Sequence, residues 1–406
     1  MVGCHPWTVS GLRQVGRLLF PRGVRLTCSP LIPSSSIKTA PSWEEPPPGG
    51  GTVARKNHGD ANADIGLQLS PIVINNLAPP DAPARPTVLD TFCGIGGSSL
   101  GATMAGYDVV MATDGCPTAC AAYAVNAPGH PVVCADAAGS APFLAALASA
   151  AKASGTPASF DCILVSLPCQ GFSTASTNRR TDPRRDLGSL FLPSLLALRP
   201  TVVVFENVCG FGISGEWAAL KTALLRRFDV QEHVISAARC GVPQRRNRFF
   251  AACVPRGSED RLSPAVAALD SRPETTMRQV FPDLRTYFHC PRGASDPGVF
   301  DSDRPAPTVR TTCAAKPNKD RYRPRRRDAG PIADASVLSV ADWARVQGFP
   351  TTWVLPSTTA SCSCRFCSSS RRRPAPRLVG NAVCPAVMAF VLRHLAHLFG
   401  GKRPRP

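Results

Sequence analysis

Short apolar runs alternate with helix-like stretches from residue 85 to residue 254, and this alternation constrains the fold more than any other feature of the chain. Regular strand–helix alternation is typical of a doubly wound sheet covered by helices. Residues 85–254 are therefore predicted to form an α/β, Rossmann-like domain. Strands are expected at 87–90, 107–113, 131–134, 160–166, 201–205, 230–236 and 248–254, and helices at 98–104, 116–126, 141–151, 189–198 and 217–227.

The rest of the chain departs from this pattern. Residues 1–84 are basic and rich in Ser, with no acidic residue before Glu44, which predicts a disordered tail or a transit peptide. Residues 255–378 are rich in Pro, Arg and Ser and predict a small irregular region. Residues 379–400 are expected to return to the large domain. Helices are expected in these last two segments at 338–347 and 386–398.

Composition limits the partners and the compartment. The chain carries 46 Lys and Arg against 28 Asp and Glu, a net charge of +18, which fits a polyanionic partner such as nucleic acid. The alternative is compositional drift in a chain rich in Arg, Ala and Pro. The 17 Cys show no disulfide spacing and indicate a reducing compartment. No apolar run approaches the ~20 residues that span a membrane, so no membrane partner is expected.

Two strand ends carry a candidate catalytic pair. Cys169, within Pro168-Cys169-Gln170, follows the apolar run 160–166, and Glu206 follows the apolar run 201–205. Open α/β sheets place ligands at the carboxyl ends of their strands. A lone Cys is more often a small buried hydrophobe than a nucleophile. The strand-end acid beside it favours the nucleophile.

A glycine-rich turn after the first strand indicates a cofactor site. Asp90-Thr91-Phe92-Cys93-Gly94-Ile95-Gly96-Gly97 joins a strand to a helix, where glycines let the backbone approach a ligand. Asp114 and Asp136 end the second and third strands, and a carboxylate there can hold ribose hydroxyls. The three features together predict a cofactor of adenosine type. The alternative is a tight turn with solvated acids.

Arginines follow the penultimate turn of the large domain. In Gln244-Arg245-Arg246-Asn247-Arg248, Arg246 and Arg248 lie two residues apart on an extended segment and share a face. They could hold an acceptor oxygen of the substrate. In isolation, a solvated basic strand end would explain them equally.

Taken together, these motifs closely resemble those of the cytosine-5 methyltransferase family, over residues 86–254 and 303–395. They occur in the family's order, which makes the resemblance specific. After the motifs quoted above come Arg304-Pro305-Ala306-Pro307-Thr308-Val309, Gln347-Gly348-Phe349-Pro350 and Gly380-Asn381-Ala382-Val383.

The resemblance implies a mechanism on double-stranded DNA with S-adenosylmethionine as the cofactor. Cys169 would attack C6 of a cytosine flipped out of the duplex, which makes C5 nucleophilic. Glu206 would hydrogen-bond N3 and the exocyclic amine. Arg246 would contact O2, and Arg248 would support that side. A monomer in the nucleus is expected, with an organelle as the alternative that the N-terminus allows.

The resemblance also assigns binding residues. Residues 255–378 would be the target-recognition region, and the loop after Cys169 would close over DNA, with its arginines on phosphates. The expected cofactor residues are Asp90, Phe92, Gly94, Gly96, Gly97, Asp114, Asp136, Pro168, Leu190 and Asn381. The expected DNA-binding residues are Gln170, Ser173, Arg179, Arg180, Arg184 and Arg185.

Some features depart from the family. The acid at the second strand is usually Glu, whereas here it is Asp114, followed by Gly115. About twenty residues beyond Leu284 are left for reading the target, so a short recognition site of about two to four base pairs is expected. Cys362, Cys364 and Cys367 lack a clear fourth ligand, so no metal is predicted.

Two other functions stay open. A tRNA cytosine-5 methyltransferase would share the fold and the nucleophile, but the Cys-Phe-Thr signature usual in that branch is not found. A catalytically silent DNA-binding relative is disfavoured by the intact Cys169, Glu206 and cofactor turn.

Overall fold

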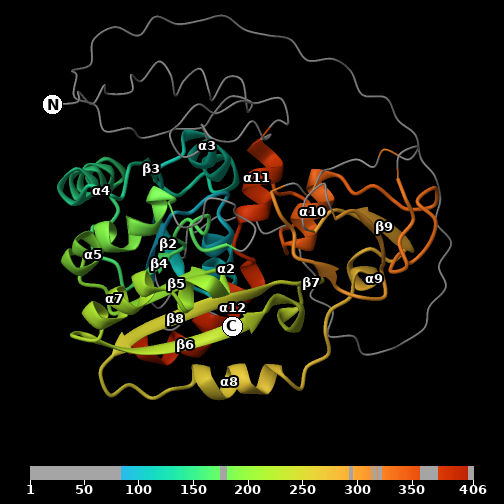
Figure 1. Cartoon of the computed structure of the whole chain (residues 1–406). Helices are drawn as coiled ribbons and strands as arrows, with labels where there is room; N and C mark the ends of the chain where they lie inside the picture. Colours follow the sequence, from blue (N-terminus) through green and yellow to red (C-terminus); the bar gives the residue numbers. More distant parts are fainter. Residues whose placement is uncertain are drawn as a thin grey trace, which may run out of the picture.

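The computed structural model describes residues 84–173, 181–291, 296–311, 313, 318, 322–356 and 374–400. Its centre is a seven-stranded sheet in the order β3-β2-β1-β4-β5-β8-β6 (Figure 1). Strands β1 to β5 pair in parallel, and β8 pairs antiparallel with both β5 and β6. The predicted doubly wound α/β sheet is confirmed. The strands are β1 (Thr87–Thr91), β2 (Asp108–Asp114), β3 (Val132–Cys134), β4 (Cys162–Val165), β5 (Val202–Asn207), β6 (Phe228–Ser236) and β8 (Asn247–Pro255).

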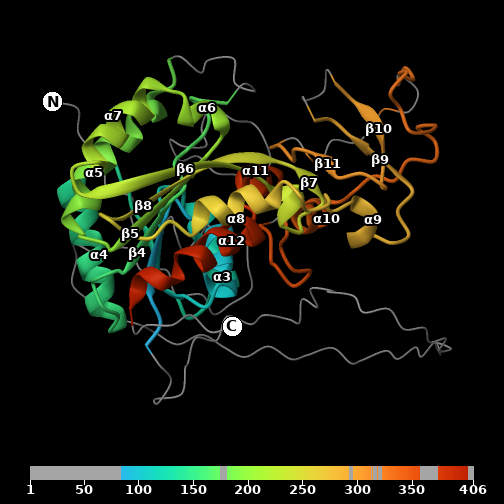
Figure 2. The ribbon, with the colours of Figure 1, turned by 90° about the horizontal axis from the view of Figure 1, so that it is seen from below.

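Alternate residues along the central strands pack against two helical layers, one on each face of the sheet. Val88 packs in one apolar cluster and Leu89 in another, because successive side chains of a strand point to opposite faces. One layer holds α2 (Gly97–Met104), α8 (Leu262–Leu269) and α12 (Pro385–Leu395), and the other holds α4 (Ser140–Ser154), α5 (Leu187–Ala197) and α7 (Gly215–Leu224) (Figure 2). Helix α3 (Pro117–Asn126) packs near the β2–β3 edge.

The boundary predicted at residue 255 lies too early in the chain. Leu262 and Leu269 of α8 are buried in the same cluster as Val387 and Leu395 of α12. The large domain therefore continues through α8. Near the end of the described chain, α12 packs against α2 and covers β1 and β2 of the large domain.

The small region has more regular structure than its composition predicts. A two-stranded hairpin of β9 and β10 packs beside short helices, and two-residue strands β7 and β11 pair in parallel. Tyr287 and Trp343 are buried there in one cluster with Ile95 and Leu100 of the large domain. The elements are β7 (Gln244–Arg245), α9 (Met277–Val280), β9 (Thr286–His289), β10 (Gly298–Asp301), β11 (Ala306–Pro307), α10 (Val340–Val346) and α11 (Pro374–Asn381).

One helical run is long and apolar enough to cross a membrane by length and composition. It is Pro374–Phe399, which joins α11 and α12, and 67% of its apolar window is buried inside the protein. Its length is not expected from the sequence. Its burial against α2 and the sheet is that of a core helix.

Two predicted segments lie outside the described residues. These are the extension at 1–83 and the Cys/Ser/Arg insertion at 357–373, with Cys362, Cys364 and Cys367. Within the part of the chain that the structure describes, no group of three His, Cys, Asp or Glu side chains could hold a metal ion.

Candidate active site

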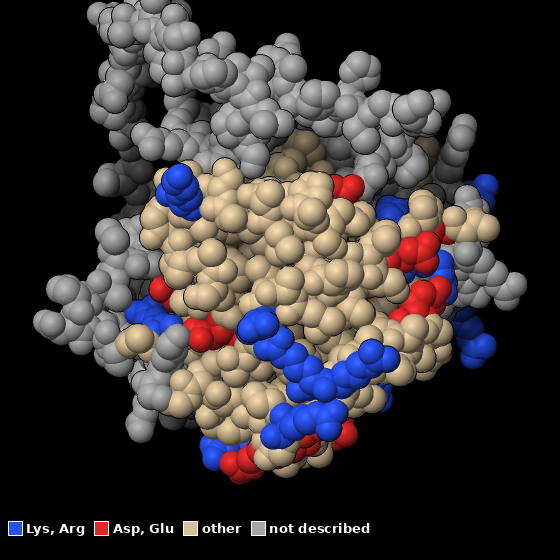
Figure 3. Space-filling model, turned by 90° about the vertical axis from the view of Figure 1, so that its left-hand side faces the viewer, with Lys and Arg blue, Asp and Glu red and all other residues tan. Residues whose placement is uncertain are grey.

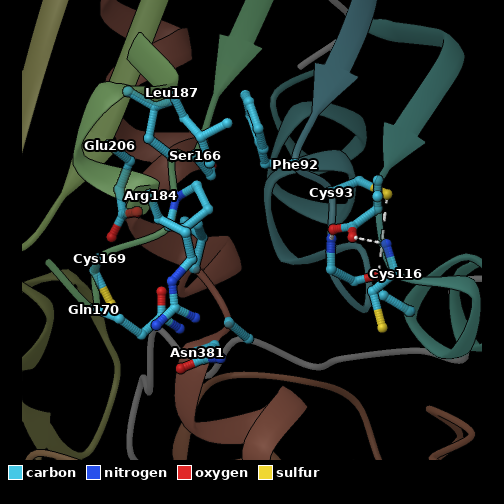
Figure 4. Close-up of a pocket in the computed structure, with 18 of the residues that line it drawn as sticks. Phe92, Cys93, Cys116, Ser166, Cys169, Gln170, Arg184, Leu187, Glu206 and Asn381 are labelled. Atoms are coloured by element: carbon cyan, nitrogen blue, oxygen red, sulfur yellow. Dashed lines mark hydrogen bonds between the residues drawn. The ribbon is translucent and has the colours of Figure 1, made fainter. Parts of the chain in front are cut away.

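One cavity opens at the carboxyl ends of β1, β2, β4 and β5, where sequence reasoning placed the site. Its walls enclose about 1140 Å³ of space, part of it open to solvent. Cys169 and Glu206 lie on one side, and Phe92, Cys93 and Cys116 lie on the other (Figure 4). All four predicted catalytic residues and six of the ten predicted cofactor residues therefore border a single cavity.

Cys169 stands on a tight turn that follows β4. Its carbonyl oxygen accepts hydrogen bonds from the backbone N–H groups of Phe172 and Ser173, at 3.0 and 2.9 Å, which fixes the turn. Burial raises the pKa of the Cys169 thiol, and the nearby cation of Arg248 works in the opposite direction. The thiol therefore needs a base or a rise in pH to reach the thiolate.

Glu206 is buried near the end of β5 and faces Arg248 of β8. The distance between Glu206 Oε1 and Arg248 Nε is 3.4 Å. Burial raises the pKa of the Glu206 carboxyl, and Arg248 lowers it in part. A carboxyl with a raised pKa keeps its proton to higher pH than usual and can donate it to a ring nitrogen.

The second half of the cavity is organised by Asp114 at the end of β2. Its Oδ2 accepts a hydrogen bond from the Gly94 N–H at 3.0 Å, and its Oδ1 accepts one from the Cys116 N–H at 2.8 Å. Asp136, after β3, lines the same wall and accepts from the Ala138 N–H. Two carboxylates therefore border the cavity at successive strand ends, as predicted.

Comparison with known proteins decides the family. A profile of the C-5 cytosine-specific DNA methylase family matches residues 87–296, from the first strand of the sheet through the arginine pair. The chain belongs to this family. The protein is thus a DNA (cytosine-5-)-methyltransferase, and we refer to it below as the methylase.

Individual relatives cover most of the methylase. The type II methyltransferase M.HgiDI of Herpetosiphon aurantiacus is 29% identical over 308 residues, which are 75% of this chain and 92% of that protein. M.HindV of Haemophilus influenzae is 25% identical over 75% of this chain and 94% of its own length. The S. pombe Dnmt2 methyltransferase matches in structure with a TM-score of 0.54 at 18% identity, over 78% and 99% of the two chains, which shows the shared fold.

Arg246 and Arg248 of the methylase make different contacts from those predicted. Arg246 was expected to contact the substrate and Arg248 to support it. Instead, Arg246 is 2% exposed and donates to the carbonyl oxygens of Val309, Gly380 and Ala382 at 3.1, 3.1 and 2.9 Å. Burial lowers the pKa of Arg246 to about 10. Both arginines border the cavity, but Arg248 is the one ion-paired with Glu206.

Three predicted cofactor residues lie behind the cavity wall. A Cβ added to Gly97 would come within 2.1 Å of the Val383 carbonyl oxygen, so this glycine permits close packing. Gly96 has φ of 92° and packs against Tyr123. Asp90 is fully buried and accepts from the Ser99 N–H and hydroxyl at 3.0 and 2.6 Å. These three residues hold the turn, whereas Phe92 and Gly94 line the cavity.

The predicted cofactor residue Leu190 lies on α5, outside the cavity wall. It is 46% exposed and does not line the cavity, whereas Leu187, three residues earlier on α5, does. Pro168 and Asn381 line the cavity as predicted. Sequence reasoning missed Leu187 and Cys116, for which no pattern in the sequence distinguishes a cavity-facing side chain from a core one.

The arginines of the predicted closing loop are engaged within the protein. Arg184 pairs with Asp182 and borders the cavity, and Arg185 pairs with Glu216 at 2.6 Å. The Arg185 guanidinium lies 4.6 Å from the centre of the Phe172 ring. Both arginine side chains thus contact other residues of the protein in this conformation, whereas the sequence predicts that they contact DNA phosphates.

The other predicted DNA-binding residues differ in position. Gln170 borders the cavity, and its Oε1 is buried with no hydrogen-bond partner among the described residues. Ser173 lies at the end of the same turn, while Arg179 and Arg180 fall in the segment 174–180, outside the described residues. The surface over α4, α5 and α7 is largely uncharged, with Lys and Arg gathered toward one end (Figure 3).

The buried Asp90 predicts a pH-dependent stability. Burial raises the pKa of Asp90 from 3.8 to about 7, despite its hydrogen bonds to Ser99. A folded-state pKa above the unfolded one gives stability that is present at low pH and is lost as pH rises through 7. Between about pH 5.5 and about pH 8.5 this loss is roughly 2 kcal/mol. Urea unfolding at both pH values should show that the free energy of unfolding falls by this amount more in the parent than in Asp90→Asn. Parallel pH profiles would contradict the assignment.

Proposed function

We propose that the methylase transfers a methyl group from S-adenosylmethionine to C5 of a cytosine flipped out of double-stranded DNA, with Cys169 as the covalent nucleophile. The observation that carries this proposal is the meeting of Cys169 and Glu206 with the Asp114 wall in one cavity. A cofactor held at Asp114 and a base held at Glu206 would share that space.

The residues of the Asp114 wall fit the proposed cofactor. The Gly94 and Cys116 N–H groups hold the Asp114 carboxylate at the cavity wall, and a carboxylate there can accept from a ribose hydroxyl. Asp136 can accept from the adenine amine, and the Phe92 ring offers an apolar surface between them. Gly94 has open space where a Cβ would be, so its backbone can lie against a ligand. When bound, S-adenosylmethionine supplies an electrophilic methyl group.

The remaining chemistry belongs to the protein's own side chains. The Cys169 thiolate forms a bond to C6, and the ring electrons move toward N3. Glu206, protonated, donates to N3 and neutralises that charge, and Arg248 holds Glu206 in place. C5 then carries the electron density that attacks the methyl group. Loss of the C5 proton to a base restores the double bond and breaks the bond from C6 to sulfur, which releases Cys169.

Cofactor binding can be tested at the two strand-end carboxylates. Asp114→Ala and Asp136→Ala should each weaken S-adenosylmethionine binding by about 1–3 kcal/mol, since each would leave a donor of the bound cofactor without its acceptor. Asp114→Ala should have the larger effect, because Asp114 also holds Gly94 and Cys116. Isothermal titration calorimetry measures both, with Asp334→Ala, an exposed acid of the small region, as the control. Unchanged affinity in both variants would refute the cofactor assignment.

The nucleic-acid substrate is tested by expression in a host that lacks cytosine-5 methylation. We expect methylated sites in DNA by bisulfite sequencing, at a short target, and none with the Cys169→Ser variant. Methylation confined to tRNA would favour the tRNA enzyme instead, and no methylation of either would favour the silent relative. We also propose a monomer, acting in the nucleus or in an organelle. Light scattering and a fluorescent fusion of the full chain test these two points.

A further inference from the structure

A cluster of cysteines lies behind the Asp114 wall, and the proposed mechanism does not use it. Cys93 follows β1, Cys120 belongs to α3 and Cys134 ends β3, and the three pack together with Tyr123. Cys93 and Cys120 are 5% and 1% exposed, whereas Cys134 is half-buried. None of these three is in a disulfide.

Two of these cysteines lie side by side at the β2–β3 edge. Cys134 is paired with Asp114 in the register of the two strands. The Cys120 Sγ donates to the Asp114 carbonyl oxygen at 3.3 Å, and the same oxygen accepts the backbone N–H of Ala135. Cys134 is also the neighbour that raises the pKa of the Cys120 thiol the most. The strand register and the Cys120 hydrogen bond therefore place both cysteines against Asp114, within one packed cluster.

We propose that Cys120 and Cys134 are a redox-sensitive dithiol, a modification site that peroxide converts to a disulfide and that thereby weakens cofactor binding at Asp114. The two thiols differ in accessibility in the way that a peroxide-sensing pair requires. Cys134 reaches solvent and can be oxidised first. Cys120 is buried beside it and can only react with its neighbour.

The two steps balance. The Cys134 sulfur attacks one oxygen of hydrogen peroxide, and the O–O bond breaks. Cys134 becomes a sulfenic acid, and the other oxygen departs as water. The Cys120 sulfur then attacks the Cys134 sulfur, the S–O bond breaks, and the departing hydroxide takes the Cys120 proton as a second water. The two thiols lose two electrons, and the peroxide gains them. The neighbouring Cys134 and burial raise the pKa of Cys120, so the second step should accelerate with pH.

The disulfide would act on the cofactor through Asp114. A bond between α3 and the end of β3 removes the Cys120 hydrogen bond to the Asp114 carbonyl and displaces the strand end. The Asp114 carboxylate positions Gly94 and Cys116 on the cavity wall, so its displacement disturbs both. This effect rests on the proposed role of Asp114 in cofactor binding, whereas formation of the disulfide does not.

The test uses the full chain in a Cys169→Ser background, so that oxidation of the nucleophile cannot contribute. The protein is treated with hydrogen peroxide and then digested for mass spectrometry. S-adenosylmethionine affinity is measured by calorimetry before oxidation, after it, and after reduction with dithiothreitol. Cys134→Ser removes the pair, and Cys290→Ser, a buried cysteine of the small region, is the matched control.

We expect a linked Cys120–Cys134 peptide and a reversible loss of cofactor affinity of about 3- to 10-fold, the equivalent of one lost hydrogen bond. Both changes should be absent in Cys134→Ser and present in Cys290→Ser. Oxidation without this linked peptide would overturn the proposal, whatever the affinity does. A linked peptide with unchanged affinity would overturn the coupling to Asp114. Failure of cofactor binding in the reduced protein would instead count against the proposed function.

Discussion

Cys169→Ser should lower methyl transfer by on the order of 10⁴- to 10⁶-fold, the scale of loss when a covalent nucleophile is removed. A serine hydroxyl ionises far less readily than a thiol, so the attack on C6 loses its nucleophile while the shape of the site is kept. Incorporation of labelled methyl groups into DNA measures turnover, and DNA containing 5-fluorocytosine traps the covalent adduct.

Both signals should disappear in Cys169→Ser, while S-adenosylmethionine affinity stays at the parental value. Cys240→Ser provides the matched control, since Cys240 is also half-buried and free but lies outside the cavity. A Cys169→Ser variant that turns over near the parental rate, or that is still trapped, would refute the assignment of the nucleophile.

Glu206→Gln should give the second-largest effect, a fall in turnover of about 10²- to 10⁴-fold, which is the usual contribution of a positioned acid. Glutamine keeps the size of the side chain but cannot protonate N3. Glu216→Gln is the control, since Glu216 pairs with Arg185 outside the cavity. Single-turnover rates with excess enzyme separate this loss from weaker DNA binding.

The pH profile distinguishes a proton donor from a structural partner of Arg248. Burial raises the pKa of both Cys169 and Glu206. The active form needs the Cys169 thiolate together with a protonated Glu206, so activity should rise with pH at the acid end and fall at the alkaline end, which gives a bell-shaped profile in the parent. Glu206→Gln should lose the alkaline fall. A variant that keeps both limbs would show that another group carries the proton.

The large sheet could be predicted from the sequence because its central strands are buried on both faces. Runs such as 202–205 are apolar throughout and are followed by a polar residue, so the sequence shows both the strand and its functional end. The hairpin of β9 and β10 could not be predicted in the same way. Its strands are only four residues each, and they mix aromatic with polar residues in a Pro- and Arg-rich segment.

The site was predictable at the level of motifs but less so at the level of single contacts. Strand ends identified Cys169, Glu206 and Asp114, because parallel strands bring their carboxyl ends to one edge. Arg246 differs from Arg248 because it donates to carbonyl oxygens of Val309 and of the Gly380 turn, which are distant in sequence. No local sequence pattern shows which of the two guanidinium groups will donate hydrogen bonds to these carbonyl oxygens.

The position of α12 in the chain bears on how the protein is made. This helix is among the last described residues, yet it packs on α2 and covers an apolar face built from the first strands, and the Tyr107 hydroxyl donates to its Leu392 carbonyl oxygen. During synthesis that face is exposed from the appearance of β2 until α12 leaves the ribosome. Nascent chains of this kind need protection from aggregation. We therefore expect the yield of soluble protein to depend on chaperones, and ribosome-bound chains halted before Pro385 to remain sensitive to protease.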